Sequence, residues 1–414
     1  MSDAILKSVS APIPSGENTI PAARSGIREG LLRRALARLQ VGCLNCILPD
    51  GERFTVEGPL PGPQATVRIS NWRVVDRLIL GGDIGIAEAY MAGEWDSPDL
   101  SAVLDLGLRN EEAMRGALSP PWPVRLLNRM RHALRANTPR GSRRNIAAHY
   151  DLGNAFYEKW LDETMSYSSA LFEELDEPMV DAQDRKYIRL AKALDLQPGE
   201  HVLEIGCGWG GFAEIAARDF GCRVTGITLS VEQAAYARNR MKRLGLDDRV
   251  DIRIQDYRAL TGTYDKIASI EMFEAVGEAY WPVYLNVLKT RLAKGGRAAL
   301  QIITIDDEYF ETYRRSADFI QRYIFPGGML PGPDAFNKAV AQSGMRITDT
   351  YFFGPSYAET LRRWDTAFVD AWPDIRKLGF DERFRRMWRY YLAYCEAGFD
   401  AGRIDVAQFV IESA

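Results

Sequence analysis

From about residue 145 onward, short apolar runs alternate with stretches whose apolar positions recur every three or four residues. The runs have the length of buried strands, and the stretches have the period of helices. Elements that alternate at this spacing predict an α/β domain with a doubly wound, mostly parallel sheet. Strands are predicted at 201–205, 223–228, 250–254, 266–270 and 298–305, with helices over 211–219, 231–244 and 281–292. A helical, aromatic-rich insertion (306–343) and two closing strands (346–353, 405–411) follow.

The first part of the chain has a shorter, mixed pattern. Residues 1–25 are rich in Ser, Pro, Gly and Ala and predict a mobile tail. A basic helix comes next, followed by short strands that turn signals separate (43–48, 53–56, 65–69) and by two or three helices between 72 and 106. We therefore expect a small mixed α+β domain over 26–118 and the α/β domain over 145–414.

The segment between these domains, residues 119–144, is strongly basic. It lies within a stretch from Ala113 to Tyr150 that has eight arginines and no acidic residue. An apolar side chain at every fourth position predicts an amphipathic helix, followed by a linker: Trp122, Leu126, Met130 and Leu134. Such a helix can lie on an anionic membrane surface, or its apolar face can pack on the adjoining domain.

Composition narrows the class of protein. The 414 residues carry a formal net charge of −4, which argues against a nucleic-acid-binding protein. No apolar run is long enough for a spanning helix, and no signal peptide is visible at the N-terminus. Five cysteines and three histidines predict neither a disulfide framework nor a histidine-built metal site. We expect a cytoplasmic enzyme without a metal.

A glycine-rich loop follows the strand at 201–205. Glycines let the backbone turn tightly and let a ligand approach closely. A dinucleotide site usually has an acidic residue after the second strand, whereas here Glu204 precedes the glycines and 224–230 has no acid. This order resembles the first motif of S-adenosylmethionine (SAM) methyltransferases. The loop glycines are Gly206, Gly208, Gly210 and Gly211.

Further along, Asp256 and Tyr257 follow the third strand. Asp256 can accept a hydrogen bond from an adenine amino group while Tyr257 lies against the ring. Alternatively, Asp256 is a simple helix N-cap.

Several strings together resemble the cyclopropane-fatty-acyl-phospholipid synthase family, over about residues 145–414. They are HYDLGN (149–154), MSYSS (165–169), the glycine loop, QDYR (255–258), MFEAVG (272–277) and YIFPGG (323–328). The resemblance implies a class I SAM methyltransferase fold with a lipid-site insertion, and an N-terminal domain that binds lipid or membrane. It also implies transfer of the SAM methyl group to a cis double bond of a phospholipid acyl chain. In ring-forming members, the resulting carbocation then loses a proton to close a cyclopropane.

Residues of the expected SAM site are carried over by position. They are Tyr167, Ser168, Glu204, Gly206, Gly208, Trp209, Gly210, Thr228, Gln233, Asp256, Tyr257 and Ile270. Among the many aromatic residues, we expect four to lie near the ligand: Tyr150, Tyr167, Tyr323 and Tyr357.

The expected catalytic positions depart from the family pattern. Glu274, Ile303 and Tyr357 resemble three of five groups that hold a bicarbonate base, but Ser169 replaces a cysteine and Gln301 a histidine. Glu271 stands where a small residue is expected. Two nearby carboxylates repel, so one can act as the base instead of bicarbonate. Alternatively, Glu271 points away and pairs with an arginine.

The product and the partners stay open at this level. The string from Ile270 to Gly277 is similar to relatives that make methyl- or methylene-branched chains instead of rings. The expected partners are unsaturated phospholipid at an anionic membrane surface, a second copy of the chain, and a downstream reductase or desaturase. The enzyme is expected to associate peripherally with the inner face of the membrane. An inactive lipid-binding protein and an NAD-dependent oxidoreductase are the alternative functions.

Overall fold

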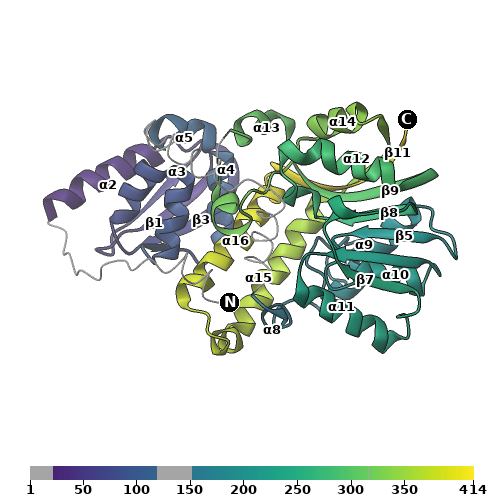
Figure 1. Ribbon diagram of the computed structural model, residues 1–414. Coiled ribbons are helices and arrows are strands. Elements are labelled where there is room, and N and C mark those ends of the chain that lie inside the picture. Colours follow the sequence, from purple (N-terminus) through teal and green to yellow (C-terminus); the bar gives the residue numbers. More distant parts are fainter. Residues whose placement is uncertain (1–21, 119–151, 316) are drawn as a thin grey trace.

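The computed structural model describes residues 22–118, 152–315 and 317–414 (Figure 1). An N-terminal unit packs a four-stranded sheet, in the order β2-β1-β3-β4, against helices. Its strands are β1 (Val41–Ile47), β2 (Arg53–Glu57), β3 (Leu60–Ile69) and β4 (Trp95–Asp96). Its helices are α2 (Ala22–Leu36), α3 (Arg73–Met91), α4 (Leu100–Arg109) and α5 (Glu111–Leu118). Helix α2 begins at Ala22, within the range predicted as a tail. Residues 1–21 and the predicted basic helix and linker (119–144) lie outside the described residues.

The second unit is built on a seven-stranded sheet in the order β10-β11-β9-β8-β5-β6-β7 (Figure 1). The neighbouring strands β9, β8, β5, β6 and β7 run parallel to one another. Strand β11 is antiparallel to both of its neighbours, β10 and β9. This confirms the predicted α/β class. The strands are β5 (His201–Ile205), β6 (Arg223–Thr228), β7 (Val250–Ile254), β8 (Tyr264–Ile270), β9 (Leu292–Ile305), β10 (Met345–Phe352) and β11 (Ile404–Ser413).

Helices cover both faces of this sheet. Neighbouring residues of a strand point to opposite faces, so Val202 joins one buried cluster and Leu203 another. The helices of the first cluster are α9 (Met179–Ala193), α10 (Gly211–Arg218) and α11 (Val231–Leu244). Those of the second include α12 (Trp281–Arg291) and α14 (Pro333–Gln342). Burial on both faces explains why the strands read as continuous apolar runs.

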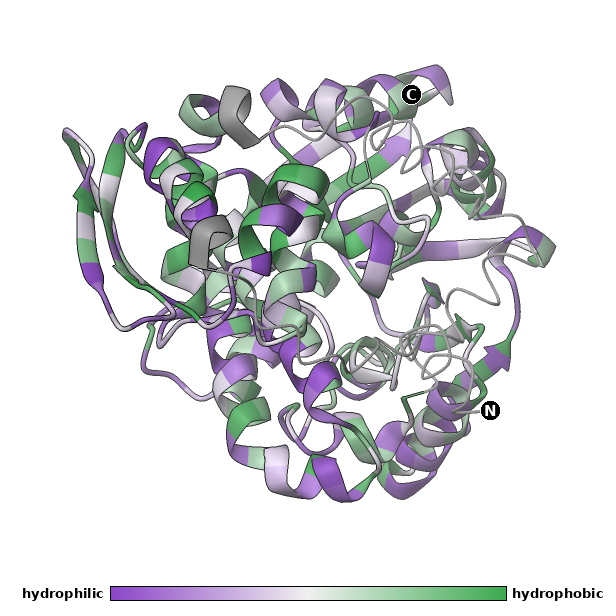
Figure 2. Cartoon of the chain, turned by 90° about the vertical axis from the view of Figure 1, so that its left-hand side faces the viewer, coloured by the Kyte–Doolittle hydropathy of each residue, from purple (hydrophilic) through white to green (hydrophobic). Residues whose placement is uncertain are grey.

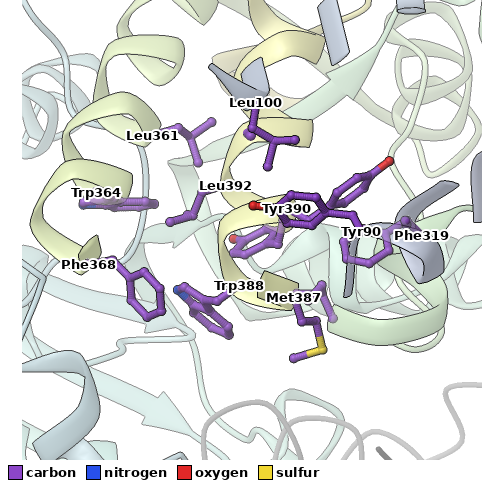
Figure 3. Packing of buried hydrophobic residues seen from close by; sticks show 14 of the residues in the cluster. Tyr90, Leu100, Phe319, Leu361, Trp364, Phe368, Met387, Trp388, Tyr390 and Leu392 are labelled. Atoms are coloured by element: carbon purple, nitrogen blue, oxygen red, sulfur yellow. The ribbon is translucent and has the colours of Figure 1, made fainter. Parts of the chain in front are cut away.

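Two long helices, α15 (Gly354–Lys377) and α16 (Glu382–Asp400), pack on each other between the two units (Figure 1). The sequence analysis did not identify them. Trp364 of α15, Trp388 of α16, Tyr90 of the N-terminal unit and Phe319 of the insertion belong to one buried cluster, part of which Figure 3 shows. One hydrophobic core therefore joins the N-terminal unit to the α/β unit.

The insertion after β9 contains α13 (Asp307–Tyr313) and a π-helix, η4 (Ile320–Ile324). Shorter elements are α8 (Asn154–Tyr157) and three 3₁₀ turns: η1 (Tyr257–Ala259), η2 (Phe273–Ala275) and η3 (Glu278–Tyr280). Figure 2 shows hydrophilic and hydrophobic residues mixed along the helices of the N-terminal side. Within the described residues, no helix combines the length and apolar character that crossing a membrane requires.

Candidate active site

Two cavities meet above the carboxyl ends of the parallel strands, where ligands bind in open α/β sheets. The glycine loop lines the first cavity, and apolar side chains of the insertion, α15 and α16 line the second. Tyr167, Glu271 and Ala275 line both cavities. A ligand in one cavity is therefore adjacent to a ligand in the other.

The glycine loop leaves its backbone open to the first cavity. Gly206 and Gly208 have φ values of 87° and 50°, in the left-handed region that favours glycine. A Cβ at Gly206 would lie 2.8 Å from Cγ of Met272, whereas a Cβ at Gly208 would meet nothing within 4 Å. Because Gly208 itself lines the cavity, any side chain there would occupy ligand space.

Glu204, at the end of β5, offers an acceptor to this cavity. Its Oε2 is buried and has no hydrogen-bond partner within the described part of the chain. Burial raises the pKa of this carboxyl well above its usual value. Buried polar atoms are nearly always paired, so an unpaired acceptor beside open glycine backbone fits a ligand that carries hydroxyl donors. A SAM ribose has such donors.

The structure brings together all but two of the residues expected to bind SAM. Those that line the first cavity are Tyr167, Ser168, Glu204, Gly206, Gly208, Trp209, Thr228, Gln233, Tyr257 and Ile270.

Gly210 and Asp256 are not among the residues that line it. A Cβ at Gly210 would lie 3.0 Å from Met241 Cε, so this glycine allows α10 and α11 to pack closely. The Asp256 carboxylate accepts from the Arg258 backbone N–H at 2.9 Å and forms an ion pair with the Arg258 side chain. This geometry corresponds to the N-cap alternative.

The second cavity is mostly apolar and rich in aromatic rings. The hydroxyl groups of Tyr167 and Tyr391 are hydrogen-bonded at 2.8 Å along one wall. Tyr357 stacks on Phe399 with ring centroids 4.6 Å apart. An apolar pocket with a few convergent polar groups is typical of a small-molecule or lipid site. The other lining aromatics are Tyr313, Phe325 and Tyr394.

Glu271 accepts three hydrogen bonds where the cavities meet. Its carboxylate receives the Ser169 backbone N–H at 2.9 Å, Gln301 Nε2 at 2.7 Å and the Tyr357 hydroxyl at 2.6 Å. The alternative that Glu271 points away to an arginine is therefore wrong. Glu271 also has a φ of 49°, a left-handed conformation that is uncommon for a residue with a side chain.

Glu274 interacts electrostatically with the carboxylate of Glu271. Its Oε1 accepts the Ile303 backbone N–H at 2.5 Å, while its Oε2 is buried without a partner among the described residues. Burial, together with the neighbouring charge of Glu271, raises the pKa of Glu274 to about 8. Burial also raises the pKa of Glu271, but its three donors oppose that shift. The environments therefore make Glu271 the more readily ionised of the two carboxyls.

This arrangement does not fit a separate bicarbonate ion. Ser169, Gln301 and Tyr357 correspond to three of the five expected bicarbonate-holding positions, and the Glu271 carboxylate already occupies their donors. A planar carboxylate that belongs to the chain stands in the place expected for the planar anion.

Two further tyrosines, Tyr323 and Tyr150, were expected to lie near the ligand. Tyr323 lines neither cavity: its hydroxyl donates to Glu88 of α3 at 2.6 Å, so it connects the π-helix to the N-terminal unit. Its neighbours Ile320 and Gln321 line the second cavity instead. Tyr150 lies outside the described residues.

Sequence reasoning missed several groups at the site. Tyr391 and Phe399 come from α16, whose aromatic residues recur every three or four positions and offered a signal for a helix. Lys186 of α9 is buried behind the site, with Nζ 2.6 Å from Ser168 Oγ and from Gln183 Oε1. Burial lowers its pKa to about 7. A lone lysine in an amphipathic helix gave no sequence signal.

Comparisons with known proteins show which family the chain belongs to. Residues 137–409 match the family model described as mycolic acid cyclopropane synthetase. The chain belongs to this cyclopropane synthetase family. A tuberculostearic acid methyltransferase of Mycobacterium tuberculosis is 39% identical over 97% of this chain and 94% of its own length. The cyclopropane-fatty-acyl-phospholipid synthase of Escherichia coli is 36% identical over 86% of this chain and 89% of its own length.

Solved structures agree with the assignment to this cyclopropane synthetase family. A mycolic acid cyclopropane synthase complexed with SAH and CTAB superposes with a TM-score of 0.62 at 30% identity, covering 65% of this chain and 97% of that one. The chain is therefore a SAM-dependent methyltransferase, with lipid methyltransferase or cyclopropane synthase activity. SAM supplies the methyl group as an electrophilic sulfonium, and the first cavity holds the residues that fit it.

Proposed function

We propose that this enzyme methylates the double bond of an unsaturated acyl chain in membrane phospholipid and gives the released proton to Glu271. The product would be a methyl- or methylene-branched chain. The observation that carries the proposal is the Glu271 carboxylate, which three donors hold at the junction of a SAM cavity and an apolar cavity.

The two adjoining cavities support the methyl transfer. An alkene is a weak nucleophile, so its carbon must be held in line with the methyl group, and this positioning supplies much of the acceleration. An acyl chain in the second cavity passes Tyr167 and Ala275, which also face the first cavity. The reacting carbon and the methyl group therefore meet at these residues.

The second cavity suits the cation that the transfer creates. When the alkene electron pair forms the new C–C bond, the neighbouring carbon becomes positive and must be shielded from water. Aromatic faces attract cations, most strongly where water is excluded. Tyr167, Tyr357 and Phe399 provide such faces beside the two carboxyl groups.

Glu271 completes the reaction as the base. A C–H bond of the chain next to the cation breaks, its electron pair forms the new double bond of a methyl-branched alkene, and the proton passes to the Glu271 carboxylate. For a methylene branch, a hydride first shifts from the methylated carbon to the cationic carbon, and the C–H bond that then breaks belongs to the new methyl group. Three hydrogen bonds stabilise the ionised form of this carboxylate and orient it. Glu274, with its raised pKa, stays neutral at pH 7 and adds no second negative charge.

Two observations favour a branch over a ring. The relative matched over 97% of this chain is named a methyltransferase, and a Pseudomonas putida relative, 33% identical over 87% of the chain, is named a probable fatty acid methyltransferase. Ser169, Gln301 and Glu271 also depart together from the pattern expected for the bicarbonate-dependent ring closure.

The test is turnover on monounsaturated phospholipid vesicles with SAM that carries a fully deuterated methyl group. A product with three deuteriums has lost a chain proton and is a methyl-branched alkene. A product with two deuteriums whose exocyclic =CD2 group is seen by ²H NMR is a methylene-branched chain. Cyclopropane protons by NMR would contradict the branch, and no product from any unsaturated lipid would favour the inactive lipid-binding alternative.

We also propose peripheral association with a membrane, because the acyl substrate is part of one. Exposed apolar side chains on the N-terminal unit support this: Ile27 and Leu31 of α2 and Leu80 of α3. Binding that rests on apolar insertion should survive high salt in a vesicle sedimentation assay, whereas binding through basic residues should be lost because salt screens exposed charges. Failure to sediment at any salt concentration would contradict peripheral association.

A further inference from the structure

Two buried glutamines lie side by side behind Glu271. Gln301 of β9 and Gln408 of β11 are cross-strand partners, and their side chains are 1% and 0% exposed. Gln408 Nε2 donates to Gln301 Oε1 at 3.1 Å and to the Lys186 backbone carbonyl at 3.1 Å. Buried amides are tolerated where their donors and acceptors find partners.

A guanidinium fixes the direction of this chain of hydrogen bonds. Arg189 of α9 donates through Nη1 to Gln408 Oε1 at 2.8 Å. Because a guanidinium only donates, Gln408 must turn its oxygen toward Arg189 and its NH₂ toward Gln301. Gln301 must then turn its oxygen toward Gln408 and its NH₂ toward Glu271, to which it donates at 2.7 Å. If either amide were flipped, like groups would face each other.

We infer that Gln408, held by Arg189, is a positioning residue that makes Gln301 present a donor to Glu271. The inference rests on the proposed function for its catalytic consequence, but the orientation of Gln301 follows from the contacts alone. An amide oxygen in place of the NH₂ would put a lone pair against the carboxylate and disfavour its ionised form.

Other charged and titratable groups also face Glu271 and influence its pKa, so their influence must be distinguished from that of the Gln301 orientation. They are Lys186 of α9, Glu274 of η2 and Tyr357 of α15. Arg189 itself contacts β10, where it lies over the Tyr351 ring at 3.8 Å and 3.8 Å from the Asp349 carboxylate. A substitution at Gln408 leaves these side chains in place, although it removes the hydrogen bond from Gln408 to the Lys186 backbone carbonyl.

The test is Gln408→Glu, with Gln408→Met as a second variant in case the first does not fold. A carboxylate at 408 accepts from Arg189 and from Gln301, which turns the Gln301 oxygen toward Glu271. We expect the acidic limb of the kcat/KM profile to move up by about one pH unit, a tenfold loss of rate on that limb. With methionine, Gln301 loses its fixed orientation, and a smaller upward shift is expected.

Controls separate positioning from packing. Arg189→Met should reproduce the shift of the acidic limb. Arg189→Lys should keep the wild-type profile, because a lysine side chain also only donates hydrogen bonds. Thr225→Val removes a part-buried hydrogen bond of the same sheet, between the Thr225 hydroxyl and the His201 ring at 2.9 Å, and should lower Tm without moving the profile.

A second readout distinguishes this inference from the proposed function. The Glu271 pKa can be followed by NMR of ¹³C-labelled glutamate, with Glu271→Gln used to assign the signal. If this pKa rises in the Gln408 variants but the rate profile stays in place, positioning holds and Glu271 is not the base. If the pKa is unchanged in folded Gln408 variants, the inference is overturned.

Discussion

Glu271 combines an unfavourable backbone with favourable side-chain contacts. Its φ of 49° costs of order 1–3 kcal/mol for a residue other than glycine, and such strain persists where the surroundings fix it. Here Ser169, Gln301 and Tyr357 hold the carboxylate. A strained residue held by three donors between two cavities is better explained by a chemical role than by packing.

Glu271→Gln tests that role. The amide keeps the size of the side chain but cannot take a proton, so kcat should fall by roughly 10²- to 10⁴-fold. The Kd for SAM should change little, and both are measured with the vesicle assay and calorimetry. Glu278→Gln, which removes an exposed carboxylate paired with Arg314, is the matched control and should keep its rate. An active Glu271→Gln enzyme would exclude Glu271 as the base.

Glu274 predicts a pH dependence of stability. Its carboxyl titrates near 4.5 when unfolded and at about 8 when folded, so folding takes up a proton between these values. The unfolding free energy therefore falls as pH rises through this window and levels off above about 8.

Glu274→Gln removes that proton uptake. Compared with the wild type, its Tm should be similar near pH 4.5 and higher by several degrees above pH 8. Thermal unfolding at pH 5.0 and 8.5, buffer values that roughly bracket the transition, provides the measurement. A Tm difference that is equal at both pH values would show that Glu274 titrates normally.

At the level of elements, two glycine variants should distinguish a loss of stability from a loss of SAM binding. Gly206 and Gly199 share a φ of 87°, but a Cβ would meet Met272 only at Gly206, which also lines the first cavity. Both alanine variants should lose stability through backbone strain, by about 1 kcal/mol or more. Only Gly206→Ala should also weaken SAM binding, by tenfold or more in calorimetry. Equal SAM affinity in the two variants would contradict the placement of SAM in this cavity.

The regular elements of the α/β unit were readable from sequence because their pattern is local. Strands 201–205, 223–228 and 250–254 were predicted with the bounds that the structure shows. Helices α15 and α16 were missed because their many aromatic residues face a core shared with the N-terminal unit, and nothing local indicates that partner.

The site was only partly readable for a related reason. The glycine loop and Glu204 lie within one short segment, so their chemistry could be predicted together. The contact of Ser169 with Glu271 joins residues 102 apart, and that of Arg189 with Gln408 joins residues 219 apart. Such contacts depend on strand order and on side-chain direction, which sequence pattern does not specify. Sequence therefore left the orientation of Glu271 open.

At the level of the whole molecule, Arg386 is one of several side chains that link the two units. Arg386 of α16 donates to the backbone carbonyls of Tyr90 and Trp95 and forms an ion pair with Asp96 at 3.0 Å. Since α16 also lines the second cavity, the N-terminal unit supports the wall of the substrate site.

Arg386→Met should therefore loosen the junction. Charge-assisted hydrogen bonds are worth about 1.5–3 kcal/mol each, so the unfolding free energy should fall by roughly 2–4 kcal/mol in urea. Arg385→Met, which removes an ion pair within α16 itself, to Glu382, should cost less than about 1 kcal/mol. Equal losses would show that the units are not coupled through Arg386.

The proposed base, Glu271, is one that the chain itself provides, and Glu271→Gly in bicarbonate-free buffer tests this role most directly. Glycine suits the left-handed backbone and leaves the donors of Ser169, Gln301 and Tyr357 facing an empty space the size of a small carboxylate. Wild-type lipid methylation should not depend on bicarbonate, whereas the variant should be inactive without it and regain activity when bicarbonate is added. A wild type that loses activity when bicarbonate is removed, or a variant that works without any added anion, would exclude Glu271 as the base.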